Sequence, residues 1–206
     1  MIEWNYTLSF RAAINVFSGL AVAGLVDRMV MRNGSGLPYI PGSSVKGRWR
    51  FFAERLLKSA HIPELQLHEE KQPIFKLPDK SCTICKLFGN PSIPALIWVS
   101  DAQLDGSLVS LFEDILKTSP NPVVHPDIEL RSGIALSRKT RTALDDHLFF
   151  DEVLPSGVVF SGNIKINGHI SDEESRFLKT SAKVVDCIGG RKAVGRGILD
   201  NGIQIL

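Results

Sequence analysis

Apolar and polar residues alternate at the start of the chain, and this feature constrains the fold most. The apolar residues on one side are Ile2, Trp4, Tyr6, Leu8 and Phe10. A period of two predicts a strand over residues 2–14 with one buried face. Such a strand requires partner strands, and the later segments that can supply them are 95–104, 158–166 and 197–206.

A basic helix is expected after the sequence Pro41-Gly42-Ser43-Ser44. It begins near Ser43 or Ser44, whose hydroxyls are suited to capping its first turn. The apolar residues predicted to form its buried stripe are Phe51, Phe52, Leu56 and Leu57.

A second helix is expected late in the chain. Ser171, followed three residues later by Glu174, forms a capping box at its start. The pair Gly189-Gly190 is typical of a helix end. The order strand, helix, strands, helix, strand therefore predicts one α+β domain over residues 1–206, built on a ferredoxin-like sheet.

Two regions are expected to depart from this core. Residues 59–95 contain five prolines and predict an irregular insertion. Residues 130–162 predict a protruding β-hairpin with a polar, basic tip. The acidic residues expected in or after that tip, and exposed to solvent, are Asp145, Asp146, Asp151 and Glu152.

The bulk composition excludes several classes of protein. The chain has 24 Lys and Arg against 22 Asp and Glu, so any anion binding must come from local clusters. Three cysteines argue against a disulfide framework. No run approaches the roughly 18 apolar residues of a membrane span, and no signal-like segment begins the chain. We therefore expect a cytoplasmic protein without a membrane partner.

Three basic clusters are candidates for binding phosphate. The first is the helix start, where the alternative is a capped surface helix with a solvated basic face. The second is the glycine-rich segment 189–199, where a simple helix-to-strand turn explains only the first two glycines. The third is the hairpin tip, which alone reads as a solvated loop. The candidate residues are Ser43, Ser44, Lys46, Arg48 and Arg50; Gly190, Arg191, Lys192, Gly195, Arg196 and Gly197; and Arg138, Lys139 and Arg141.

Cys82 and Cys85 have the spacing of half a zinc site. His68, with His61 as a second candidate, could add a ligand from the insertion. The alternative is a reduced structural pair. Cys187 is expected in the core. Asp27, in "VAGLVDRMVM", reads from the residues alone as a salt-bridged loop residue.

Four segments, in order, resemble the RAMP-superfamily backbone subunit of type III CRISPR effector complexes. They are "GLPYIPGSSVKGRWR", "CTICKLFG", "SRKTRTALDDHLFFDEVLPSGVVFSG" and "GGRKAVGRGIL". The resemblance implies a modified RNA-recognition-motif core with a thumb hairpin. It also implies a filament of copies of the chain along guide RNA, with other effector subunits and target RNA as partners.

The resemblance also implies a catalytic role for Asp27. In target-cleaving members an aspartate before the Pro-Gly-Ser-Ser segment cuts RNA with a divalent ion such as Mg²⁺, and Asp27 stands at that place. The chain lacks the histidine and glycine pair that usually precede that aspartate. A purely architectural RNA-binding subunit is therefore the alternative. A stand-alone RNA-processing endonuclease would need a histidine beside a glycine-rich element, and His125, His147 and His169 do not stand there.

Overall fold

The computed structural model describes residues 2–60, 62, 64–67, 82–118 and 125–206. The fold is mixed α/β with antiparallel sheets, as expected for the fold class. The helices are α1 (Gly42–Ser59), α2 (Thr83–Phe88), α3 (Gly106–Thr118) and α4 (Asp172–Lys183), with a 3₁₀ turn at Lys192–Val194. The strands are β1 (Ile2–Ser9), β2 (Tyr39–Ile40), β3 (Ile97–Val99), β4 (Ala102–Leu104), β5 (Glu129–Leu136), β6 (Ala143–Val153), β7 (Val159–Ile166) and β8 (Gln204–Ile205). Among the described residues, no helix has the length and hydrophobicity needed to cross a membrane.

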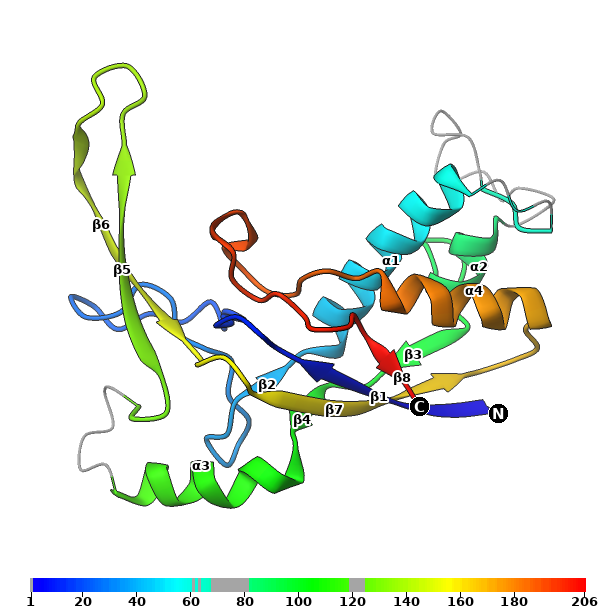
Figure 1. The fold of residues 1–206 in the computed structure, drawn as a ribbon, viewed down its shortest axis with the longest axis horizontal. Coiled ribbons are helices and arrows are strands. Elements are labelled where there is room, and N and C mark those ends of the chain that lie inside the picture. Colours follow the sequence, from blue (N-terminus) through cyan, green and yellow to red (C-terminus); the bar gives the residue numbers. More distant parts are fainter. Residues whose placement is uncertain (1, 61, 63, 68–81, 119–124) are drawn as a thin grey trace.

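The central sheet is organised around the antiparallel pair β1 and β7. Its strand order is β2-β4-β7-β1-β8, and β3 pairs with β7 beside this path. The alternation predicted for β1 is largely confirmed, since Tyr6 and Leu8 are buried, whereas Ile2 is exposed. Helices α1 and α4 pack against each other on one face of the sheet (Figure 1).

The core between α1 and α4 is centred on Trp49. Its indole is fully buried, donates from Nε1 to Ser181 Oγ at 2.9 Å, and meets the Phe88 ring edge to face. The predicted buried stripe of α1 is wrong in part. The residues that face the core are Val45, Trp49, Ala53 and Leu57, whereas Phe51 is 43% exposed and Phe52 and Leu56 are half-buried.

Two predicted helix ends also need correction. Helix α1 begins at Gly42, and neither Ser43 nor Ser44 caps it; instead the Asp101 carboxylate accepts the Gly42 N–H at 2.8 Å. The Ser171–Glu174 capping box of α4 is present as predicted. The helix ends at Lys183, before the glycine pair, because the following residues pair in extended form with residues 197–199.

Several strands are shorter than the sequence predicts. Segment 95–104 divides into β3 and β4, because Asp101 between them turns to hold the start of α1. Segment 197–206 contains only β8 as a strand. Helix α3 lies in a segment that was not predicted to be helical. In the described part of 59–95, α2 is a buried helix and so departs from the expected irregular structure.

Strands β5 and β6 form a separate two-stranded sheet that projects from the molecule (Figure 1). We call it the β5–β6 hairpin. It ends before the predicted boundary because residues 159–166 belong to the central sheet. The expectation that Asp151 and Glu152 are solvated is wrong: both are fully buried where the hairpin joins the core.

The two glycines of α1 predict opposite effects on stability. A Cβ at Gly42 would lie 2.2 Å from the Val99 carbonyl oxygen, whereas a Cβ at Gly47 would meet nothing within 4 Å. We expect Gly42→Ala to lower the free energy of unfolding by about 1–3 kcal/mol through steric overlap. Gly47→Ala should raise it by about 0.5–1 kcal/mol. Chemical denaturation of the two variants, followed by circular dichroism, measures both; equal effects would contradict the packing at Gly42.

Candidate nucleic-acid interface

The segment that carries Asp27 runs along the base of the β5–β6 hairpin. The Asp27 N–H donates to the Phe150 carbonyl at 2.9 Å, and Asp27 Oδ2 accepts the Phe150 N–H at 2.7 Å. One step further, the Glu152 N–H donates to the Arg28 carbonyl, and Glu152 Oε2 accepts the Val30 N–H. These bonds fix the exposed Asp27 carboxylate to the hairpin base.

The same segment is tied to the start of β5. Arg32 forms a bidentate pair with the buried Asp127, with distances of 2.8 and 2.9 Å between nitrogen and oxygen. Arg32 also donates to the Gly36 carbonyl. Both strands of the hairpin are therefore anchored to residues 27–32.

The glycine-rich segment meets this base at Asp151. The Asp151 side chain is 0% exposed, and its Oδ2 accepts from Arg191 Nε at 3.2 Å and from Arg196 Nη1 at 3.1 Å. Arg28 Nη1 lies 3.8 Å from Oδ1 of the same carboxylate. Three arginines, from two segments far apart in sequence, thus surround one buried negative charge.

An aromatic ring lies between two of these arginines and the hairpin. The Arg191 and Arg28 guanidinium carbons are 4.1 and 5.6 Å from the centre of the Phe149 ring. Arg28 also lies 5.3 Å from the Phe17 ring centre. The Phe149 ring covers Gly133, where a Cβ would come within 2.2 Å of it. The absence of a side chain at Gly133 allows this stacking.

The glycines of segment 189–199 have different roles. A Cβ at Gly190 would lie 2.4 Å from the Phe17 ring, and one at Gly197 would lie 1.9 Å from the Ile188 carbonyl oxygen. These two glycines are required by packing. Gly195 has a φ of +78°, yet a Cβ there would meet nothing within 4 Å. It lies in the exposed part of the loop with Lys192 and Val194.

Asn15 closes the loop from the core side. It is fully buried, and with its amide oriented to satisfy both ends it donates to the Gly190 carbonyl and accepts from Arg196 Nη1 at 2.9 Å. Arg196 is therefore held at two points, and its side chain is only 12% exposed. Its role is to order the loop, while Lys192 is left on the surface.

The cations of α1 are largely used within the molecule. Lys46 Nζ donates to the Ile97 carbonyl at 2.9 Å, and burial, together with the nearby Arg50 charge, lowers the Lys46 pKa. Arg50 donates to the Gly89 carbonyl at 2.6 Å and pairs with Glu54. Each of these contacts fixes α1 to a neighbouring element or to itself.

Arg48 joins α1 to the segment after α4. Its Nε donates to the Cys187 carbonyl at 3.0 Å, and its Nη2 donates to Asp186 Oδ1 at 3.1 Å. Burial acts to raise the Asp186 pKa, but hydrogen bonds from Cys187 and Arg48 lower it overall. The Arg48 guanidinium also lies 4.9 Å from the centre of the exposed Phe51 ring. Cys187 is buried, as predicted.

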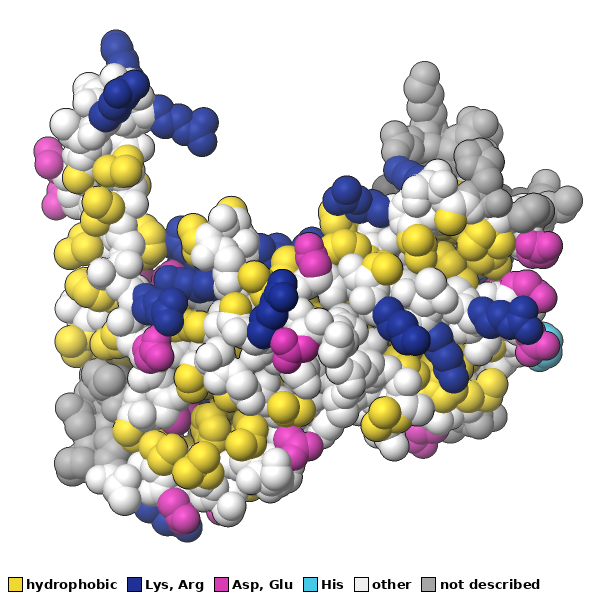
Figure 2. All heavy atoms as spheres, viewed as in Figure 1, with side chains coloured by type: hydrophobic (Ala, Val, Ile, Leu, Met, Phe, Trp, Pro, Cys, Tyr) yellow, Lys and Arg dark blue, Asp and Glu magenta, His cyan; other side chains and the backbone are white. Residues whose placement is uncertain are grey.

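The hairpin tip carries Arg138, Lys139 and Arg141, all exposed. Figure 2 shows a broad concavity between the β5–β6 hairpin and α1, with Lys and Arg side chains at the tip of the hairpin and along the floor. The structure thus brings the glycine-rich segment and the Asp27 segment together at Asp151 on the hairpin base, and places the tip cations at the far end of the same hairpin.

The predicted metal ligands are only partly described. Cys82 and Cys85 are buried, and Cys82 Sγ accepts the Cys85 N–H at 3.2 Å at the start of α2. Burial raises the Cys85 pKa. His68 and His61 lie outside the described residues. In the part of the chain that the structure does describe, no three His, Cys, Asp or Glu side chains gather closely enough to hold a metal ion.

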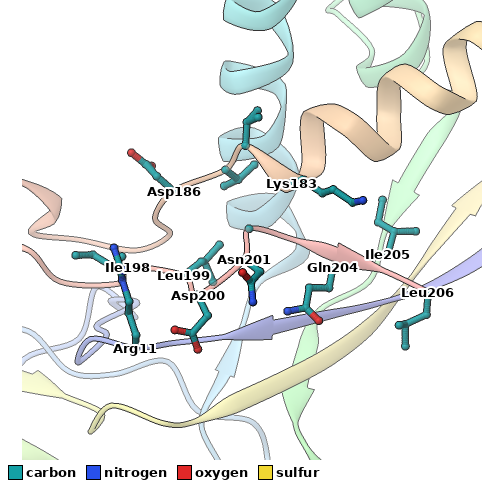
Figure 3. Close-up of a pocket in the computed structure, with 13 residues that line it drawn as sticks. Arg11, Lys183, Asp186, Ile198, Leu199, Asp200, Asn201, Gln204, Ile205 and Leu206 are labelled. Carbon is teal, nitrogen blue, oxygen red and sulfur yellow. The ribbon is translucent and has the colours of Figure 1, made fainter.

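A separate groove of about 760 Å³ lies beside β8 and the end of α4 (Figure 3). Its charged lining has both signs, with Arg11 and Lys183 against Asp186 and Asp200. None of the candidate residues named above lines this groove, and no sequence motif pointed to it.

Alanine substitutions at Arg50 and at Lys192 compare a cation that stabilises the fold with a cation on the surface. Arg50→Ala should lower the free energy of unfolding by about 1–3 kcal/mol, because the buried Gly89 carbonyl loses its charged donor. Lys192→Ala should leave stability within about 0.5 kcal/mol of wild type, because the side chain is exposed and its hydrogen bond to the Gly189 carbonyl lies at the surface. Thermal and urea unfolding measure the stability of both variants. Equal losses of stability would contradict the structural role assigned to Arg50.

Comparison with known proteins adds the following findings. The family model of the RAMP superfamily matches residues 15–200. The chain is similar in fold to one in the cryo-EM structure of the type III-B Cmr-beta bound to cognate target RNA. The TM-score is 0.64 at 15% identity, over 100% of this chain and 97% of the other. No curated protein sequence matches the chain.

Proposed function

The chain belongs to the RAMP superfamily, and from this premise we propose that it is a backbone subunit of a type III CRISPR effector complex. In this proposal it binds guide RNA along a filament of its own copies, beside other effector subunits. It then cleaves the paired target RNA through Asp27. The alternative is a subunit of the same architecture without nuclease activity.

The observation that carries the proposal is the position of Asp27. Its carboxylate is exposed, yet hydrogen-bonded to the base of the β5–β6 hairpin and followed directly by Arg28. Arg28 and two cations of the glycine-rich segment converge on the neighbouring Asp151. An exposed carboxylate fixed to the hairpin base, with the Asp151 arginine cluster on the neighbouring residues, is suited to chemistry on a phosphodiester.

The fold elements take roles accordingly. We propose that the central sheet with α1 and α4 is the ferredoxin-like, modified RNA-recognition-motif core. The β5–β6 hairpin is the thumb, and its basic tip contacts the RNA backbone. The match to the type III-B Cmr-beta, which is bound to cognate target RNA, supports RNA as a ligand and CRISPR subunits as partners. Cleavage would take place in the cytoplasm.

The residues around Asp27 fit a divalent ion only in a limited way. Mg²⁺ often binds proteins through one or two carboxylates and takes its other ligands from water and substrate phosphate. Asp27 supplies one carboxylate, and among the described residues no cluster of three acidic or His/Cys ligands accompanies it. A bound Mg²⁺ would stabilise negative charge that develops on the phosphate.

The chain's own residues would orient the reacting strand. The hairpin base and Asp27 move as one unit, because Phe150 binds both the backbone and the side chain of Asp27. If the hairpin displaces a target nucleotide, its 2′-OH is brought toward the adjacent phosphate. Arg28 is placed to stabilise the charge on that phosphate. Lys46 is engaged with the Ile97 carbonyl and is assigned no part in this step.

A structural zinc ion at Cys82 and Cys85 remains a proposal. The described residues supply two thiols, while a structural zinc site takes about four ligands. His68 would have to complete the set. No step of the proposed function depends on this ion.

The nuclease proposal is tested by Asp27→Ala in the reconstituted effector complex. We expect the complex to assemble on guide RNA and to lose divalent-ion-dependent target cleavage by at least about 100-fold, as is usual when a catalytic group is removed. Asp145→Ala removes an exposed carboxylate from the same hairpin and serves as the control. Unchanged cut sites with Asp27→Ala would leave the architectural subunit as the answer.

Gly47 offers a test of the RNA-binding face of α1. An exposed glycine inside a helix lowers stability without a structural gain, and it permits close approach of a ligand backbone. We expect Gly47→Ala to weaken guide-RNA binding several-fold while making the fold more stable. Gly106→Ala, at an equally open glycine of α3, is the control. Binding unchanged by Gly47→Ala would exclude the α1 face around residue 47 from the interface.

A further inference from the structure

Two of the three arginines around Asp151 remain open to solvent. The side chains of Arg28 and Arg191 are 43% and 29% exposed, whereas Arg196 is 12% and Asp151 is 0% exposed. The buried carboxylate offsets only one of three positive charges, and the exposed Asp27 carboxylate lies beside them. The fully buried Glu152, whose N–H donates to the Arg28 carbonyl, adds a third carboxylate, so the cluster has no formal excess of positive charge; its exposed rim instead presents two guanidinium groups.

The donors of these two arginines are only partly used. Arg191 bonds to Asp151 through Nε, and among the described residues neither of its Nη atoms has a hydrogen-bond partner. Arg28 lies 3.8 Å from Asp151, too far for a hydrogen bond, so its guanidinium donors are also available. Guanidinium groups bind phosphate oxygens through paired N–H donors.

The two guanidinium groups are positioned before any ligand arrives. Both lie against the Phe149 ring, which is fixed over Gly133. Asp151, itself buried on β6, also accepts a hydrogen bond from Arg191 and lies 3.8 Å from Arg28. These contacts restrict both side chains before a ligand binds, so less conformational entropy is lost on binding.

We propose that Arg28 and Arg191 together bind one phosphodiester group of RNA, next to Asp27. Asp151 and Phe149 are positioning residues that act through the two arginines. The inference rests on the proposed RNA-binding function and assigns it a phosphate site. The phosphate can come from the guide strand or from the target strand, because both present the same group.

The test uses the full chain and a labelled single-stranded RNA, followed by addition of the complementary strand. Affinity and its salt dependence are measured for wild type, Arg28→Ala, Arg191→Ala and the double variant. Arg176→Ala removes an exposed arginine from α4 as the control. We expect the double variant to bind about tenfold more weakly, as for loss of a charge-assisted contact. The slope of log K against log salt concentration should become shallower by about 0.7, the value for one phosphate contact on a single strand. Two separate phosphate contacts would change it by about 1.4.

The two arms identify the strand. Weaker binding of the first RNA assigns the phosphate to the guide-like strand. If binding of the first RNA is unchanged and the complementary strand is retained about tenfold more weakly, the phosphate belongs to the target strand. A double variant that matches Arg176→Ala in both arms, or that loses two phosphate contacts, overturns the site. Asp27→Ala is read by cleavage alone, so failure of the phosphate site and failure of the nuclease proposal are distinguishable.

For Asp151→Asn, the positioning role and net charge predict changes of RNA affinity in opposite directions. Asp151→Asn removes a negative charge, and net charge alone would tighten binding to a polyanion. Loss of the positioning contact should instead weaken binding several-fold. Phe149→Leu keeps every charge and removes the ring; it should weaken binding in the same way, with both folds checked by circular dichroism. Binding as tight as wild type in Phe149→Leu, or tighter in a folded Asp151→Asn, overturns the positioning role.

Discussion

The buried carboxylate of Asp151 is the constraint on which the arrangement of the interface depends. An unpaired charge in the interior is strongly unfavourable, so a fully buried aspartate requires its cationic partners to be in place. Those partners, Arg28, Arg191 and Arg196, come from the Asp27 segment and the glycine-rich segment. The Asp151 side chain therefore joins the hairpin, the Asp27 segment and the loop at one point, in addition to the bonds that Phe150 and Glu152 make to residues 27–30.

Because of this arrangement, a cluster of basic residues in the sequence does not by itself indicate a basic surface. Arg48, Arg50 and Arg196 donate to the Cys187 and Gly89 carbonyls and to Asp151, so their charges serve packing. The cations that remain on the surface are fewer, and they lie at the hairpin tip, at Lys192 and at the rim formed by Arg28 and Arg191. The charge available at the interface thus depends on which cations stay exposed beside their internal partners rather than on the number of basic residues.

Two local patterns were predicted correctly from the sequence, whereas the serine cap of α1, part of its buried stripe and the long-range ion pairs were not. The alternation in β1 and the Ser171–Glu174 capping box depend on neighbouring residues, and both are present in the structure. The burial of Asp151 depends on partners 40 and 45 residues away on one side and more than a hundred on the other, which no local pattern encodes. Phe51 was misassigned because Trp49, not Phe51, is the large residue that faces α4, through its bond to Ser181.

Glycines show where packing ends and a ligand surface can begin. At Gly42, Gly190 and Gly197 an added Cβ would overlap neighbouring atoms, so the fold itself accounts for these residues. At Gly47 and Gly195 an added Cβ would meet no atom of the described chain within 4 Å. Gly47 lies in the middle of a helix, where glycine is unfavourable, and Gly195 lies between the exposed Val194 and the anchored Arg196. Since packing does not require a missing side chain at Gly47, close approach of an RNA backbone gives a physical reason for it. At Gly195 the backbone itself favours glycine, because its φ of +78° lies in the left-handed region.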